Sequence, residues 1–249
     1  AAKPDTGRNG RRADPWATDA DDVWPFAPAT TRVFNFEAPN ALAGFSMIAA
    51  GTAGPAPVWR LTPEGASPDG TVALVRLTKP APTRFALLMD RQDQARNLDV
   101  RVRFRIQGGR VSPAVGIVFG FTGPKTYDVL AYNEARGDLS LIKIAEPTHT
   151  TLQQTPVNLP MGGVGAATAA VVTPAPAPVA KSGWHTLHLL VKDGQIRGWL
   201  DMNKRINTQD PAYQGGKVGL WAQGDTVAAF DDWTVDIYDG ATPPNPLGA

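Results

Sequence analysis

The chain contains no cysteine. Disulfide bonds, thiol nucleophiles and thiolate metal sites are therefore excluded, while the cellular compartment stays open, because exported and cytosolic proteins can both lack cysteine. No run approaches about eighteen consecutive apolar residues, so we expect no membrane-spanning helix. The Gly-x-Ser-x-Gly motif of a serine nucleophile is missing as well. These absences remove several classes of enzyme and membrane protein.

Charge of one sign is not in excess either. The 24 basic and 23 acidic side chains leave a net charge of +1, so the long-range field is weak and nucleic acid is not an expected partner. Only four acids are glutamates, and they are scattered: Glu37, Glu64, Glu134 and Glu146. Retaining glucanases need two carboxyl groups about 5 Å apart, commonly presented as Glu-x-Asp-x-x-Glu on one strand. We therefore predict a non-catalytic protein, with glycoside hydrolysis as the least favoured function.

What the sequence does contain is a series of short strand-like segments. In residues 97–107 apolar side chains alternate with polar or charged ones, which is typical of a strand with one face in the core and one in water. Residues 183–235 contain four more alternating segments, with Asp193-Gly194 as a hairpin turn. The remaining segments are residues 33–36, 58–61, 72–77, 85–89, 115–121, 127–132 and 139–144.

This pattern predicts the fold class and the division of the chain. Long helices are missing, so we expect an all-β fold, a two-sheet antiparallel jelly-roll sandwich. Residues 1–30 are rich in Pro, Ala, Gly and charge and predict an extended N-terminal arm. The sandwich is expected over residues 31–240, with a Pro/Ala-rich insertion at residues 145–182. Residues 241–249 are the expected C-terminal tail.

Several segments together resemble a known family. They are GIVFGF, YDVLAYNEARGDLSLIKI, GWHTLHLLV and GGKVGLWAQGDTVAAFDDWTV, in this order. Residues 98–238 are in this way similar to the laminin-G-like, concanavalin A-like jelly-roll modules of exported bacterial proteins, near the family 16 glycoside hydrolase and 3-keto-disaccharide hydrolase groups. The resemblance implies two stacked antiparallel sheets, and binding of carbohydrate or protein as the usual function.

The first functional hypothesis is a structural or interaction subunit. It would be exported and would dock through its arm and loops on a larger protein complex of the cell envelope, which could be membrane-embedded. Trp16, Trp24 and Phe26 are the predicted partner-binding residues, because a few aromatic anchors often carry an interface. The alternative is that these rings pack on the sandwich of the same chain.

The second hypothesis is a carbohydrate-binding module that uses exposed aromatic rings on a sheet face. Tyr132, Asn133 and Arg103 are the predicted ligand-binding residues. Arg103 lies between Arg101 and Arg105 on the wet face of residues 97–107, where the three cations could meet an anionic sugar or the carboxylates of a partner. A solvated face paired with acidic neighbours is the alternative explanation for these arginines.

Metal binding has one candidate site. Asp231 and Asp232 could help to hold a structural Ca²⁺, which takes six to eight oxygen ligands. Strict alternation places Asp231 on the core face with Trp233, where a metal, a backbone N–H or a cation must satisfy it. His185 and His188 are three apart on a strand and point to opposite faces, so we expect no shared metal there. No other cofactor is predicted.

The start of the sequence bears on localisation. The chain begins with Ala1 and Ala2 and has no initiator methionine. A signal peptidase cuts behind small residues, so a periplasmic or secreted location is expected.

Overall fold

The computed structural model of the chain describes residues 22–51, 57–63, 71–76, 84–92, 94–157 and 183–240, with the backbone alone at 71–76. Most of the predicted arm, including Trp16, lies outside the described residues. So do residues 158–182 of the predicted insertion and the predicted tail.

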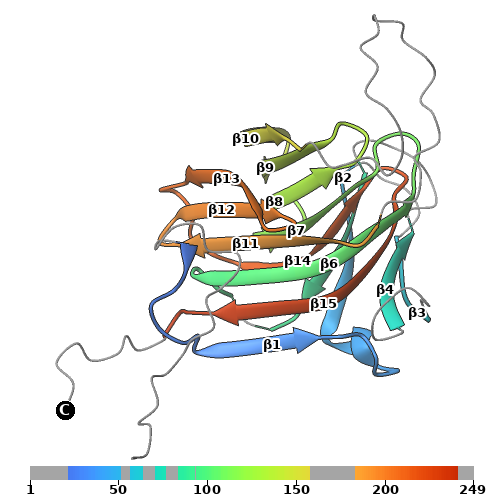
Figure 1. The fold of residues 1–249 in the computed structure, drawn as a ribbon, viewed down its shortest axis with the longest axis horizontal. Coiled ribbons are helices and arrows are strands. Elements are labelled where there is room, and N and C mark those ends of the chain that lie inside the picture. The colour runs from blue at the N-terminus through green and yellow to red at the C-terminus, as the bar shows by residue number, and fades with distance from the viewer. Residues whose placement is uncertain are drawn as a thin grey trace, which may run out of the picture.

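Two antiparallel sheets stack face to face (Figure 1). The eight-stranded sheet has the order β13-β12-β11-β6-β15-β4-β3, with β1 also paired to β15. Its strands are β1 (Thr30–Phe34), β3 (Val58–Pro63), β4 (Thr71–Arg76), β6 (Leu98–Gly108), β11 (His185–Lys192), β12 (Gln195–Leu200), β13 (Asn203–Gln209) and β15 (Val227–Ile237). The predicted all-β, two-sheet fold is confirmed.

The seven-stranded sheet has the order β10-β9-β8-β7-β14-β5-β2. Its strands are β2 (Phe45–Gly51), β5 (Arg84–Asp90), β7 (Ala114–Gly123), β8 (Thr126–Asn133), β9 (Asp138–Ala145), β10 (Thr148–Pro156) and β14 (Lys217–Gln223). A short 3-10 helix, η2 (Ala41–Gly44), precedes β2. In the part of the chain that the structure describes, no helix has the length and apolar character needed to cross a membrane.

The main core lies between the two sheets. Every second residue of β6 points into it, and Val100, Val102 and Phe104 are fully buried there. From the opposite sheet, Ile117 of β7 and Leu130 of β8 pack against this face. Each such side chain stabilises the fold by roughly 1.5–3 kcal/mol through the apolar area it removes from water.

Strand β15 joins the parts of the eight-stranded sheet, and a bulge interrupts it. One edge of β15 pairs with β6, whereas the other edge pairs first with β4 and then with β1. The register shifts between Asp231 and Thr234, and Asp232 has a φ of 46°. The bulge adds one residue to the strand, so Phe230 and Trp233 both face the core although they are three residues apart.

Three strands were not expected from the sequence, namely β2, β10 and β13. Strand β10 lies inside the predicted insertion at residues 145–182, so the first part of that segment is a strand of the sandwich. Both β10 and β13 are edge strands of mostly polar sequence. Polar edge strands protect a sheet against pairing with other chains, and they carry little apolar alternation for a sequence pattern to reveal.

The two polar edge strands close one side of the sandwich. The side-chain oxygen of Gln153 on β10 accepts from the backbone N–H of Asn207 at 3.0 Å. The Thr155 hydroxyl donates to the backbone carbonyl of Arg205 on β13 at 2.8 Å. Side chains of one sheet therefore satisfy backbone groups at the edge of the other sheet.

A second apolar cluster lies on the outer face of the seven-stranded sheet. Its members alternate with the core-facing residues of the same strands, and they include Leu87, Val129, Tyr127, Phe85 and Trp221. The rings of Phe85 and Trp221 stack with centroids 5.3 Å apart. Since these side chains are buried, the central strands of this sheet are apolar and buried on both faces.

Candidate functional site

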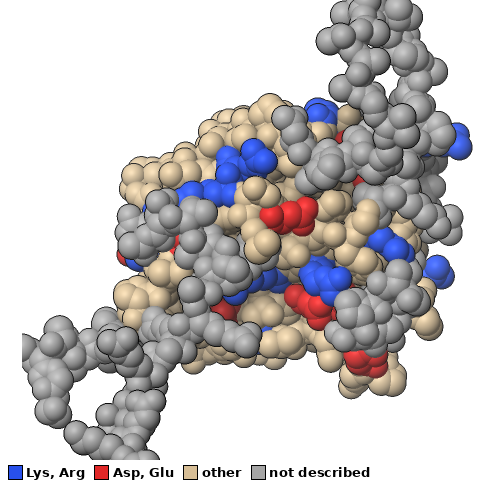
Figure 2. Space-filling model, viewed as in Figure 1, with Lys and Arg blue, Asp and Glu red and all other residues tan. Residues whose placement is uncertain are grey.

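The outer face of the eight-stranded sheet carries the charged side chains of β6. Arg101, Arg103 and Arg105 alternate with the core residues of that strand and are partly exposed. Figure 2 shows basic and acidic groups near one another on this face, between the atoms drawn in grey. The wet face predicted for residues 97–107 is therefore confirmed.

A tryptophan lies over two of these arginines. Trp184, just before β11, is partly exposed and packs on the buried Ala229 of β15. The guanidinium carbons of Arg103 and Arg105 lie 5.2 and 5.5 Å from its ring centroid. Both distances are within the range of cation–π attraction. The sequence analysis did not single out Trp184. Trp184 and Leu187 are three residues apart, so strand alternation points them to opposite faces. With Leu187 in the core, Trp184 could have been placed on the outer face.

Asp232 completes this group of residues. Its carboxylate oxygen Oδ2 accepts from Arg103 Nη1 at 2.9 Å, with 38% of the Asp232 side chain exposed. We call Trp184, Arg103, Arg105 and Asp232 the tryptophan–arginine surface. It offers a flat ring, N–H donors and carboxylate oxygens side by side, which suits non-covalent recognition of a polar, ring-shaped ligand.

The prediction that Asp231 shares the core face with Trp233 is wrong. Because of the bulge at Asp232, Asp231 points to the outer face with Ala229, opposite Arg103 in the register. It is nevertheless fully buried, and its Oδ1 accepts from the backbone N–H of Asp232 at 2.8 Å. Strict alternation failed here because a bulged strand holds one extra residue.

The two aspartates do not fit the predicted Ca²⁺ site. Asp232 is paired with a guanidinium, whose charge repels a divalent cation, and Asp231 is turned toward the backbone. Among the described residues, no three acidic, histidine or cysteine side chains converge as a metal would require. Asp232 therefore belongs to the ion-paired outer face, and Asp231 is a buried acid that accepts from the backbone.

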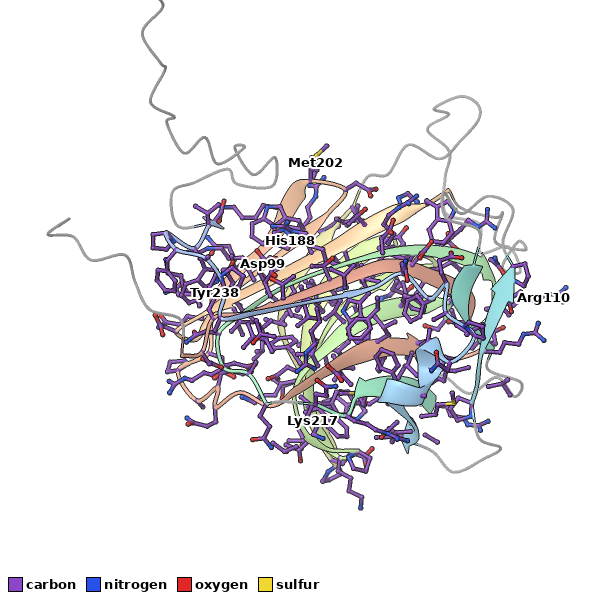
Figure 3. The ribbon with its side chains drawn as sticks, turned by 90° about the horizontal axis from the view of Figure 1, so that it is seen from below. Asp99, Arg110, His188, Met202, Lys217 and Tyr238 are labelled. Carbon is purple, nitrogen blue, oxygen red and sulfur yellow. The ribbon has the colours of Figure 1, made fainter. Side chains whose placement is uncertain are left out.

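A buried histidine lies beside a buried carboxylate further along the same face. His188 of β11 is fully buried, and its Nε2 lies 2.9 Å from Asp99 Oδ1 of β6. Its ring stacks on Trp199 with centroids 4.3 Å apart. Burial raises the pKa of Asp99, but His188 and Arg101 outweigh burial and leave that pKa below its ordinary value. Figure 3 shows His188 beside Asp99 at the end of the sandwich where Tyr238 lies.

The described end of the arm packs on its own sheet, which is the alternative that the sequence left open for its aromatic rings. Trp24 is buried, and it stacks on Tyr238 and packs against Leu190 and Trp199. Phe26 is half-buried and meets Trp24 edge-on, with centroids 5.5 Å apart. The apolar area of Trp24 is used within the chain and is not available as an anchor for another protein in this conformation.

Tyr132 and Asn133 are interior residues, so the expectation of an exposed tyrosine on a sheet face is wrong. Tyr132 of β8 points into the core, where its ring lies 5.8 Å from Phe104. Asn133 holds the β8–β9 turn, because its side-chain oxygen accepts from the backbone N–H of Arg136 and its amide donates to Ser112. Of the three predicted ligand-binding residues, Arg103 alone is on the surface.

His185 stands where the sequence placed it. It lies at the margin of the core on the opposite face from His188, and its Nδ1 is 2.6 Å from Asp201 Oδ2. The same carboxylate accepts from the backbone N–H of Thr186 at 2.9 Å. Asp201 thus holds the start of β11 to the β12–β13 turn, next to Trp184.

A third group of ionisable residues lies between the sheets. Asp128 of β8 is buried opposite Lys143 of β9, and Lys143 is ion-paired with Asp210. Burial raises the pKa of Asp128 to about 6, with Lys143 lowering it and Asp210 raising it. This group lies among the core-facing residues rather than on the tryptophan–arginine surface.

Comparisons with known proteins bear on the fold. No protein-family model and no curated protein matches the chain. The carbohydrate-binding module CBM66 from Bacillus subtilis is similar in structure, with a TM-score of 0.54 and 12% identity over 78% of this chain and 95% of that chain. A Bacillus subtilis protein of unknown function with a galectin-like fold has a TM-score of 0.52 and 10% identity, over 85% of this chain and 96% of that chain. The cellulose-induced protein Cip1 has a TM-score of 0.52 and 12% identity, over 82% of this chain and 96% of that chain. At such identities the likeness establishes the fold alone, a galectin-like jelly-roll sandwich.

Proposed function

We propose that this chain is a non-catalytic carbohydrate-binding module that binds saccharide on the outer face of its eight-stranded sheet. The observation that carries the proposal is the partly exposed ring of Trp184, lying over Arg103 and Arg105 with Asp232 beside them. The fold likeness to a carbohydrate-binding module agrees with this function, but a fold by itself does not define a ligand.

The chemistry of the tryptophan–arginine surface suits a sugar. The C–H face of a sugar ring packs on an aromatic ring, and its hydroxyl groups need directed donors and acceptors. Arg103 supplies donors and Asp232 supplies acceptors 2.9 Å away. Hydrolysis would need two accessible carboxyl groups across the scissile bond. Asp231, the nearest acid in the chain, is fully buried, so this surface supports binding rather than hydrolysis.

Docking on a larger complex remains the alternative prediction. The burial of Trp24 on its own sheet removes one of the three anchors proposed for that role. Export to the periplasm or the exterior is part of the present proposal, because polysaccharides of walls and biomass lie outside the cell.

Glycan-array screening of the full chain, followed by titration calorimetry on the best glycan, tests the proposal. Trp184→Ala should weaken binding at least ten-fold, which corresponds to about 1.4 kcal/mol. Met47→Ala is the matched control, because Met47 is an apolar side chain that is 48% exposed but lies on β2 of the seven-stranded sheet. Wild-type affinity of the Trp184→Ala chain, or no glycan retained at all, would refute the assignment.

A further inference from the structure

The arm makes a charged contact at Asp22 that resembles the recognition of a ligand. The Asp22 side chain is fully buried, and its two oxygens accept from Lys204 Nζ at 3.0 and 2.9 Å. Arg197 Nε lies 3.4 Å from Oδ1. Lys204 and Arg197 come from the neighbouring strands β13 and β12. Two cations of the sheet therefore converge on one carboxylate of the arm, as a buried charge requires.

Two residues further along, Trp24 occupies an aromatic site beside these cations. Its ring lies parallel to that of Tyr238, with centroids 4.4 Å apart and planes inclined by 12°. Lys192 Nζ lies 5.3 Å from the Trp24 ring centroid. Figure 1 shows this segment at the tip of β11, before it leads into β1. The sheet thus presents a surface for a flat ring next to a pair of cations for a carboxylate.

We propose that Asp22 and Trp24 form a self-ligand that covers a second saccharide site, and that this site takes acidic sugars of the uronate class. A uronate unit carries a ring and a carboxylate, which are the two groups that the arm inserts. Asp22 and Trp24 are two residues apart, so their Cα atoms are at most about 7 Å from each other, which is within the length of a small saccharide. The inference rests on the proposed function and adds to it a ligand class and a means of regulation.

The covered site and the tryptophan–arginine surface belong to one face. Strand β6 passes beneath both, with Asp99 against His188 near the arm and Arg105 against Trp184 at the other end. Six residues of strand span about 20 Å. Arg101 and Arg103 point outward between these ends. A polyuronate lying along β6 would meet Arg101 and Arg103 beside the carboxylates that pair with them, Asp99 and Asp232, and it could reach the covered site only when the arm has moved.

The tether sets the size of the expected effect. A ligand held on the same chain competes at an effective concentration of about 1 mM or more. The apparent affinity of the covered site falls by the fraction of molecules in which the arm is away. If the arm is away in about one molecule in a hundred, a free ligand binds about 100-fold more weakly than it would to the open site.

Full-length chains with Asp22→Asn or Trp24→Ala test the inference. Pro25→Ala is the control, because Pro25 is an exposed residue of the same segment. Binding to polygalacturonate and to a neutral galactan would be measured by affinity electrophoresis and calorimetry, with circular dichroism to verify the sandwich. We expect both opened chains to bind polygalacturonate at least ten-fold more tightly than the wild type, with galactan and the Pro25→Ala chain unchanged. The gain should shrink as salt is added.

A second substitution identifies the site. In the Asp22→Asn chain, adding Arg197→Gln should remove the gained affinity, because the ligand carboxylate then loses one of its cations. Opened chains that bind polygalacturonate no better than the wild type would overturn the inference, as would a gain that survives Arg197→Gln. The Trp184→Ala variant keeps its arm in place and tests the proposed function. The Asp22→Asn and Trp24→Ala variants test the self-ligand, so failure of one proposal can be distinguished from failure of the other.

Discussion

The outer face of the seven-stranded sheet is apolar and buried, whereas the outer face of the eight-stranded sheet carries charges and a partly exposed tryptophan. Both faces consist of alternate residues of antiparallel strands. Strand β5 reads RFALLMD and is buried along its whole length, while β6 reads LDVRVRFRIQG and is buried at every second residue over most of its length. A continuous apolar run marks a strand covered on both sides, and strict alternation marks a strand with one wet side.

This difference assigns separate roles to the two sheets. The seven-stranded sheet contributes to two apolar clusters and supports the fold. The eight-stranded sheet contributes one face to the core, and its other face carries partly exposed polar and charged side chains. Ligand recognition is expected on the second sheet, because substitutions on its outer face change few buried contacts. Substitutions on the two sheets test this division.

The largest effect is expected from Trp221→Ala on the seven-stranded sheet. Trp221 is 2% exposed, so its removal leaves a large cavity and should destabilise the chain by about 3–5 kcal/mol. The measurement is urea unfolding followed by circular dichroism. A loss below about 1 kcal/mol would mean that this outer face is not a second core.

A somewhat smaller loss is expected from Asp99→Asn, which removes the carboxylate beside the fully buried His188. The histidine then loses its charged partner in a dry site, and we expect a loss of about 3 kcal/mol at pH 7. Because the pKa of Asp99 is lowered on folding, its contribution is complete above its ordinary value and is lost as the pH falls below about 4. Unfolding measured from pH 3 to pH 7 should therefore show the two chains converging in acid.

Asp128→Asn should change stability in the opposite direction. Folding raises the pKa of Asp128 from 3.8 to about 6, so the folded chain holds a proton that the unfolded chain has released. Wild-type stability then falls as the pH rises from about 4 to about 6, by up to about 3 kcal/mol. We expect the variant to be more stable than the wild type by about 2 kcal/mol at pH 7.5. Equal stability across this range would show that Lys143 neutralises the carboxylate fully.

The smallest effect on stability is expected from Arg105→Ala. This partly exposed arginine lies over Trp184, and its loss should change the free energy of unfolding by less than about 1 kcal/mol. Its effect on glycan affinity should be larger than its effect on stability if the tryptophan–arginine surface binds sugar. Calorimetry measures the change in glycan affinity, and urea unfolding of the same preparation measures the change in stability. A change in stability without a change in affinity would mean that Arg105 serves the fold and not the binding of sugar.

Much of the fold was predictable because its central strands alternate strongly. Residues 97–107 predicted β6 to within one residue at each end, since five apolar side chains repeat at the period of a strand. Strands β10 and β13 escaped prediction because they lie at edges, where polar residues protect the sheet. Their positions depend on hydrogen bonds to each other across the sandwich.

The functional site was less predictable than the fold. Arg103 was placed on the correct face by alternation alone. Tyr132 was expected outside but is inside, because nothing in one strand tells which of its two faces meets the other sheet when both faces are apolar. Asp231 was misplaced because one bulged residue reverses the alternation.

The amino-acid sequence by itself determined the all-β class, the alternation that makes one sheet face wet, and the shortage of paired carboxyl groups. These properties follow from residue types and local periodicity. Only the tertiary structure decided that Trp184 lies over two arginines of another strand, and that Asp22 reaches cations nearly two hundred residues away along the chain. Such contacts depend on strand order and register, which are set by the packing of the whole sandwich rather than by any single segment.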